Sequence, residues 1–348
     1  MTTTLQGTKA KVSAVRRRSA GRTLGVLLIL ILIVAGLFCL ALSTGAFPIP
    51  LSKVLDTLAG QGTRRDTFVI MDVRLPRVLC GLLAGAAFGL SGALFQSLVH
   101  NPLASPDVIG VTMGASAAAV TCTVVLGVVG AAVSVSAFAG ALATAALIYL
   151  LAWRRGVTGY RLVLVGIGIG AVLGSIVSYL MSRADVTSAQ QALVWLTGSL
   201  NARSYEHVWP LLVGFVILAP AALLLTNGLT VLRLGDETAR GLGARVETLR
   251  LTILVVGVAL AAFATAAAGP VPFVAFVAGP IARRLTGERG LALAPAALVG
   301  AIVMVASDLI AQHLLTDRAL PVGVVTGAVG APFLLWQLAS ANREGRGG

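Results

Sequence analysis

RLPRVLCGLLAGAAFGLSGALFQSLVHNPLASPDVIGVTMGA (residues 74–115) contains a long apolar run with small residues placed at regular intervals. Residues 75–98 carry a single charge and are long enough for one membrane-spanning helix, which needs about 20 apolar residues. Gly85 and Gly89 form a G-x-x-x-G pattern, which lets two helix backbones approach closely. The stretch therefore predicts a transmembrane helix in tight contact with another helix. The contact is either with the chain's own helices or across a seam between two subunits, and both interpretations stay open.

The polar segment after this run predicts the start of the next helix. Ser105 is expected to cap it, Pro106 to occupy the first helical position, and Asp107 to face the positive end of the helix dipole. The same alternation of apolar runs and polar breaks continues along the chain. It predicts ten spans at about 24–42, 75–98, 108–129, 131–153, 162–182, 208–226, 249–268, 271–286, 291–315 and 320–339.

Composition agrees with an all-α integral membrane protein. The chain has 348 residues, of which 57% are hydrophobic and 11% charged, whereas soluble domains are about 45–50% apolar and about 25% charged. Of the 26 basic residues, 18 fall in the loops that are cytoplasmic if the N-terminus is inside, so we expect both termini in the cytoplasm. The net charge of +13 is thus a sign of topology, and nucleic-acid binding is excluded. The expected organisation is a basic tail (1–23), a ten-helix domain (24–340) with a cytoplasmic loop at about 230–247, and a tail (341–348).

The chain shows no pattern of an enzyme or a metal site. Its three lysines complete no phosphate-binding G-x-x-x-x-G-K-[ST] loop, so we expect no nucleotide hydrolysis by this chain and no cofactor in it. Three scattered histidines offer no metal cluster, and three cysteines inside apolar runs are expected to be core residues. Serines and aspartates occur without a nucleophile–base pattern.

Asp308 is the one acid well inside an apolar span. Intramembrane acids often mark ion or proton paths, but a lone acid also suits a structural role in capping a neighbouring broken helix. Both interpretations stay open. An ion-coupled carrier would be expected to show more than one such acid.

Four motifs in order resemble those of one family, the permease subunits of bacterial ABC importers for iron–siderophores, vitamin B12 and haem. They are the opening stretch (74–115), LGDETARGLG (234–243), AGPVPFVAFVAGPIARRLTG (268–287) and LPVGVVTGAVGAP (320–332). FQSLVHNPLASPDVIG and LLAWRRG are most similar to the ferric enterobactin branch. The resemblance covers nearly the whole chain after about residue 24.

The resemblance implies the type II importer permease fold with ten helices. It also implies a second permease subunit, for which we expect a paralogue rather than a copy, two ATP-binding subunits that hold ATP and magnesium, and an outer binding protein or lipoprotein. The expected function is import of an iron(III)–siderophore complex across the cytoplasmic membrane of a bacterium, by alternating access between the two permeases. Vitamin B12 or haem as cargo and an ion-coupled secondary transporter are the alternatives.

The family's coupling helix, which rests in a groove of the ATPase, corresponds to residues 234–243. Asp236 and Arg240 lie four apart, which predicts an ion pair of about 0.2–0.5 kcal/mol on one helical face. An apolar face of Ala239, Leu242 and Gly243 is expected to dock. The full set of expected coupling residues is Leu234, Gly235, Asp236, Glu237, Ala239, Arg240, Leu242 and Gly243. A solvated interhelical loop is the alternative.

The family's R-L-P-R motif, which meets acidic residues of the binding protein, is Arg74-Leu75-Pro76-Arg77 here. A third docking arginine of some relatives falls near Gln312, and Arg318 is expected to replace it. Anchoring of the span at the lipid headgroups is the alternative role of Arg74 and Arg77.

Glycines of the fifth and tenth spans are expected to line the pathway between subunits. They are Gly166, Gly168, Gly170, Gly174, Gly323 and Gly327. The eighth span departs from the family, because Gly279 and Pro280 stand where relatives have Pro-His, and a kink shifted by one residue is expected there.

Overall fold

The computed structural model describes residues 2–45, 47–154, 156, 158–287, 291–314 and 320–344, and every secondary-structure element among them is helical. Two of the elements, η1 and η2, are short π-helical segments. In chain order the elements are α1 (Thr2–Ser43), α2 (Leu51–Leu58), α3 (Arg64–Thr67), η1 (Phe68–Arg74), α4 (Leu75–Val99), α5 (Val111–Val120), η2 (Thr121–Val125), α6 (Ala131–Ala152), α7 (Gly159–Arg183), α8 (Val186–Leu196), α9 (Tyr205–Leu224), α10 (Thr226–Leu232), α11 (Asp236–Gly241), α12 (Val246–Ala268), α13 (Val274–Thr286), α14 (Leu293–His313) and α15 (Val322–Glu344).

All ten predicted spans coincide with helices. Eight helical stretches in the described chain are long and apolar enough to cross a membrane, and Val111–Val125 is a shorter apolar helix. The eighth predicted span corresponds to α13, which has 13 residues. Its length of about 20 Å is less than the hydrocarbon thickness of about 30 Å. The prediction of an all-α membrane protein with about ten membrane helices is confirmed, and the eighth span is a partial one.

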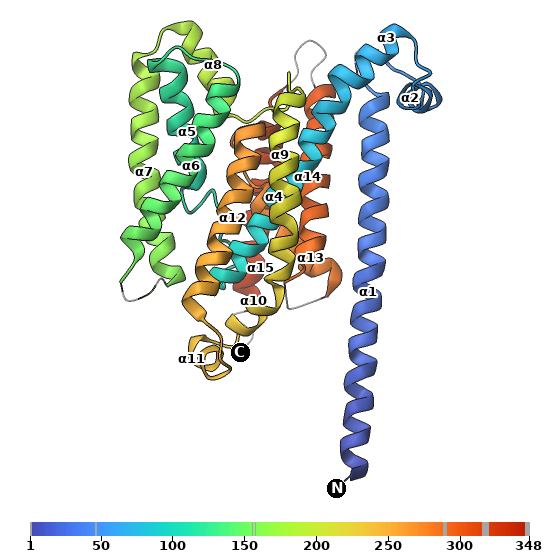
Figure 1. Ribbon diagram of the computed structural model, residues 1–348, viewed down its shortest axis with the longest axis vertical. Helices are drawn as coiled ribbons and strands as arrows, with labels where there is room; N and C mark the ends of the chain where they lie inside the picture. Colours follow the sequence, from blue (N-terminus) through green and yellow to red (C-terminus); the bar gives the residue numbers. More distant parts are fainter. Residues whose placement is uncertain are drawn as a thin grey trace.

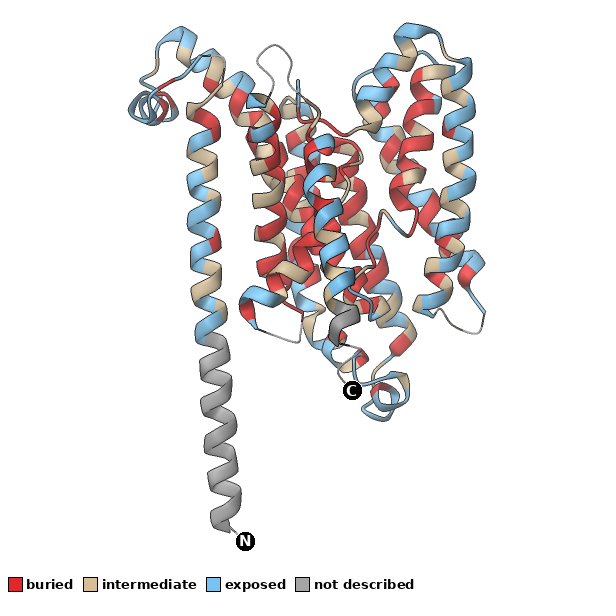
Figure 2. Cartoon of the chain, turned by 180° about the vertical axis from the view of Figure 1, so that it is seen from behind, coloured by how far each residue is buried: buried red, intermediate tan, exposed pale blue. Residues whose placement is uncertain are grey.

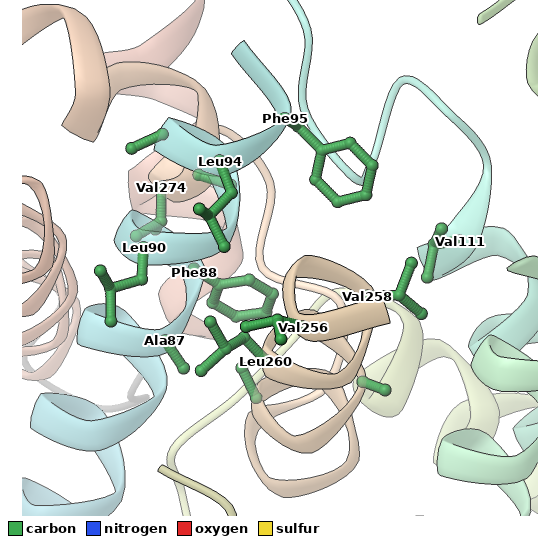
Figure 3. Close-up of a cluster of buried hydrophobic side chains, with 14 of the residues drawn as sticks. Ala87, Phe88, Leu90, Leu94, Phe95, Val111, Val256, Val258, Leu260 and Val274 are labelled. Atoms are coloured by element: carbon green, nitrogen blue, oxygen red, sulfur yellow. The ribbon is translucent and has the colours of Figure 1, made fainter. Parts of the chain in front are cut away.

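Helix α4 lies at the centre of the bundle and packs against α9, α12, α13 and α14. Phe88 and Phe95 of α4 are fully buried, and Figure 3 shows Phe88 beside Val256 and Leu260 of α12. Glycines allow this close packing, since a Cβ at Gly85 would clash with the backbone of α14. The opening G-x-x-x-G therefore packs the chain's own helices.

The bundle has two distinct ends. Figure 1 places α10 and α11 at the end where α1 begins, which we call the α11 end. The short helices α2, α3 and α8 lie at the opposite end, the α8 end. Helix α1 runs along the edge of the molecule, and most of its described apolar part is pale blue or tan in Figure 2 because it is exposed or half-buried.

The third membrane helix begins later than predicted. Ser105 accepts the backbone N–H of Val108 at 3.4 Å and so caps only a single turn. Gly110 then adopts a φ of +87°, and α5 starts at Val111. The predicted start at Ser105 was wrong because the left-handed glycine interrupts the helix, and a side chain at this position would also strike the carbonyl of Gly166 on α7.

Candidate functional site

The expected coupling segment, residues 234–243, contains the short helix α11, which projects from the α11 end (Figure 1). Gly235 and Gly243 flank α11 with φ values of +93° and +81°, conformations that glycine adopts without strain. Two leucines beside the helix are strongly exposed: Leu234 by 58% and Leu242 by 64%. Apolar side chains outside the bundle are available for contact with another protein.

The predicted ion pair within α11 is wrong. Asp236 instead accepts from Arg250 of α12 at 2.9 and 3.1 Å, and Arg240 lies 3.9 Å from Glu247. Asp236 is the first residue of a six-residue helix, so its side chain is free to reach the neighbouring helix. The charges therefore attach α11 to α12, which packs on the central helix α4.

Ala239 does not belong to an exposed apolar face. Its exposure is 0%, so this residue packs inside the chain and fixes the base of α11. The exposed apolar surface consists of Leu234 and Leu242. The remaining predicted coupling residues, Gly235, Glu237, Arg240 and Gly243, are exposed beside them.

Arg74 is buried at the junction of η1 and α4. Its guanidinium donates to the carbonyl oxygens of Leu42, at 2.6 Å, and Phe47. The first bond satisfies a carbonyl in the last turn of α1, which has no partner within the helix. Arg74 thus holds the C-terminal end of α1 against α4.

Arg77 and Asp308 form a buried ion pair between α4 and α14. Nε and Nη2 of Arg77 each lie 2.9 Å from one carboxylate oxygen of Asp308. Gln312 adds a third donor at 2.8 Å, one helical turn after Asp308. Asp308 is therefore a partner of a basic residue rather than a lone acid, and the side chain of Arg77 remains 16% exposed. Arg318 lies outside the described residues.

The predicted pathway glycines fall into two groups. Gly166 and Gly323 pack against backbone within the chain, at Ile109 and Thr197, so a Cβ at either would clash. Gly168 and Gly327 have open space where a Cβ would stand. Gly170 and Gly174 are intermediate, with single contacts to Gly110 and Met113. Among the six, Gly168 and Gly327 are therefore the two without a close neighbour in the described chain.

Sequence reasoning missed one cluster, around Pro280 of α13. Pro280 has no N–H to donate to the carbonyl of Phe276 four residues earlier. Nε2 of Gln96 on α4 donates to this carbonyl at 3.0 Å, and Oε1 of Gln96 accepts from Arg283 at 3.0 Å. A Cβ at residue 279 would clash with the Gln96 side chain, so Gly279 makes room for it. The Gly-Pro pair was the only signal in the sequence, and it did not identify the distant glutamine.

The described residues contain no group of three or more histidine, cysteine, aspartate or glutamate side chains that could hold a metal ion. Cys39, Cys80 and Cys122 are free thiols, of which Cys80 and Cys122 are buried. The described residues therefore offer two surfaces for contact with other proteins. One is the apolar projection of Leu234 and Leu242 at the α11 end, and the other is the ion-paired Arg77 near the α8 end.

Comparisons with known proteins agree with this arrangement. The ferric enterobactin transport system permease protein FepG of Escherichia coli (strain K12) is 41% identical over 92% of this chain and 96% of its own length. FepD of the same organism, also a ferric enterobactin transport system permease protein, is 36% identical over 93% and 96%. A solved structure of an inward-facing metal-chelate type ABC transporter has a TM-score of 0.82 and 26% identity, and covers 91% of this chain and 99% of its own. The model of the FecCD transport family matches residues 29–340, and the chain belongs to this family.

Proposed function

We propose that the chain is a permease subunit of an ATP-driven importer that carries an iron(III)–siderophore complex across the cytoplasmic membrane. The observation that carries this proposal is the 41% identity to FepG along almost the full length of both chains. FepG and FepD are two different permease proteins of ferric enterobactin systems, and both resemble this chain. We therefore propose that this chain pairs with a paralogous permease, two ATP-binding subunits that hold ATP and magnesium, and an outer binding protein or lipoprotein.

In the proposed mechanism the α11 end contacts the ATPase and lies in the cytoplasm with both termini. Leu234 and Leu242 enter a groove of the ATPase, where burial of each leucine contributes about 1.5–3 kcal/mol. The ion pair between Asp236 and Arg250 transmits movement of α11 to α12, and α12 in turn packs on α4. Rigid-body motion of the two permeases then opens the seam between them, lined by Gly168 and Gly327, to each side in turn.

The binding protein docks on the α8 end in this proposal. Arg77 lies in the first turn of α4 and its side chain is 16% exposed, so its paired guanidinium can share its donors with an acidic residue of the partner. Arg74 contributes by fixing α1 to α4 rather than by direct contact, because its guanidinium is bound to two backbone carbonyls. Arg318 is the further docking residue of the proposal. Such charges guide orientation and association more than they add affinity.

An ion-coupled carrier is the competing function of another class. It would need a titratable group that is free to exchange an ion, whereas Asp308 is held by Arg77 and Gln312. This pairing favours the ATP-driven importer.

Growth of a deletion strain tests the cargo. We expect that loss of this gene abolishes growth on a ferric catecholate siderophore as the sole iron source and that a plasmid copy restores it. Unimpaired growth on the siderophore together with lost growth on haem or lost use of vitamin B12 would assign the other cargo.

A further inference from the structure

A cavity of about 210 Å³ lies between α6, α9 and α12, away from the ion pairs described above. It is formed by the first turns of α6 and α9 and the last turns of α12, so it sits near the α8 end of the bundle. The rings of Phe138 and Phe263, with centroids 4.6 Å apart, line it together with Leu211 and alanines. A cavity with apolar walls favours an apolar occupant over water, which needs polar partners.

The cavity opens on a face of the protein that suits lipid. Val135, which lines it, is 67% exposed, and Trp209, one residue before its Pro210, is 60% exposed. Farther along α9, Val213, Val216 and Ile217 are also exposed. Exposed tryptophan at the end of an apolar helix is typical of the boundary between hydrocarbon and headgroups. The cavity therefore begins at headgroup level and continues toward the hydrocarbon.

Two acceptors stand at the headgroup side of the cavity. The carboxylate of Glu206 is exposed and forms no ion pair within the described chain. Pro210 has no N–H, so the carbonyl of Glu206 lacks its usual helical donor four residues later. The neighbouring His207 is turned toward Ser204, and the guanidinium of Arg203 donates to the Ser199 carbonyl. The carboxylate of Glu206 is complementary in charge to a primary ammonium group, which has three N–H donors.

We propose that this cavity binds a membrane phospholipid with an ammonium headgroup: one acyl chain fills the apolar cavity and the ammonium pairs with Glu206. The site is independent of the transported cargo. Bound lipid joins α6 to α9 and α12, so it stabilises the contact between the α5–α8 group and the rest of the bundle.

The test measures lipid binding to the complete transporter, purified and exchanged into defined lipid. Phosphatidylethanolamine is the probe with an ammonium group, and phosphatidylglycerol is the probe without one. We expect Ser134→Phe, which fills the cavity, to reduce phosphatidylethanolamine retention in native mass spectrometry at least about tenfold, equal to about 1.4 kcal/mol. Ala132→Phe adds the same ring to the same helix outside the cavity lining and is expected to retain the lipid.

The Glu206→Gln variant tests recognition of the headgroup independently of binding of the acyl chain. We expect this variant to bind both phospholipids equally, whereas the unmodified protein prefers phosphatidylethanolamine. Asp185→Asn removes another exposed carboxylate near the α8 end and is expected to leave the preference intact. Wild-type retention of lipid by Ser134→Phe would overturn the proposal. Efficient cross-linking of Val135→Cys to another subunit would overturn it as well, because the cavity would then be covered by protein.

Discussion

Arg77 and Asp308 are 231 positions apart in the chain, and their side chains meet through two nitrogen–oxygen contacts of 2.9 Å. The pair joins the central helix α4 to α14 at a depth where the side chain of Asp308 is only 6% exposed. Burying a charge at this depth costs free energy unless the charge is paired, so each of the two residues offsets the desolvation cost of the other. The pair accounts for an acid inside an apolar span without assigning it an ion path.

Breaking the Arg77–Asp308 pair on one side is expected to destabilise the protein. Arg77→Leu or Asp308→Leu alone should lower the free energy of unfolding by about 3–5 kcal/mol, because a buried charge is left unpaired. Replacing both residues by leucine should cost clearly less than the sum of the two. Thermal unfolding of the purified transporter measures this, and additive losses in the double variant would contradict the pairing.

The contact of Gln96 with the Phe276 carbonyl beside Pro280 gives a second prediction. Gln96→Leu should cost about 1–3 kcal/mol, because it leaves the buried carbonyl of Phe276 without a donor. In a Pro280→Ala background the restored N–H can bond to that carbonyl, so Gln96→Leu should then be much less harmful. A cycle of the four proteins, followed by thermal unfolding, measures the coupling. Equal effects of Gln96→Leu in both backgrounds would show that the glutamine does not compensate for the proline.

The Leu242→Asp variant should insert into the membrane normally but lose coupling to the ATPase. Leu242 is exposed, so a carboxylate there leaves the fold intact but opposes burial in an apolar groove of the ATPase. We expect normal membrane insertion and loss of ATPase activity stimulated by the binding protein. Thr248→Asp places the same charge on an exposed position at the start of α12 and serves as the control. Normal coupling in Leu242→Asp would show that the ATPase contact lies elsewhere.

Arg74 and Arg77 should respond differently to substitution. Besides the loss of stability expected from breaking its pair with Asp308, Arg77→Gln is expected to slow association of the binding protein, because an exposed edge of the charge is lost. This kinetic effect should shrink as salt is raised. Arg74→Gln should chiefly lower thermal stability, since it removes donors from the carbonyls of Leu42 and Phe47. Surface plasmon resonance at several salt concentrations distinguishes them. If Arg74→Gln alone reduced the association rate, Arg74 and not Arg77 would be the docking residue.

Apolar run length was sufficient to predict the membrane helices, because a span of about 20 uncharged residues has few alternatives in a bilayer. Boundaries were predictable where a proline or a charge ends the run, as at Arg183, the last residue of α7. The start of α5 was not, because the capping signal at Ser105 is overridden by Gly110, whose conformation depends on its contact with α7. Local signals therefore predicted elements better than their ends.

Side-chain partners were the part that the sequence did not reveal. Asp236 and Arg240 have ideal helical spacing, yet Asp236 pairs with Arg250 once α12 lies beside α11. The basic partner of Asp308 and the side-chain donor to the Phe276 carbonyl both come from α4, which is distant in the chain. Such contacts depend on packing of whole helices, which residue spacing does not specify.

Uptake of iron into vesicles distinguishes an ATP-driven importer from an ion-coupled carrier. The complete transporter, with this chain, its partner permease and the ATPase, is reconstituted and supplied with a binding protein loaded with a ferric siderophore. We predict accumulation of iron that requires ATP and that stops when the catalytic glutamate of the ATPase is replaced by glutamine. Accumulation that continues with the inactive ATPase and follows an ion gradient instead would contradict it.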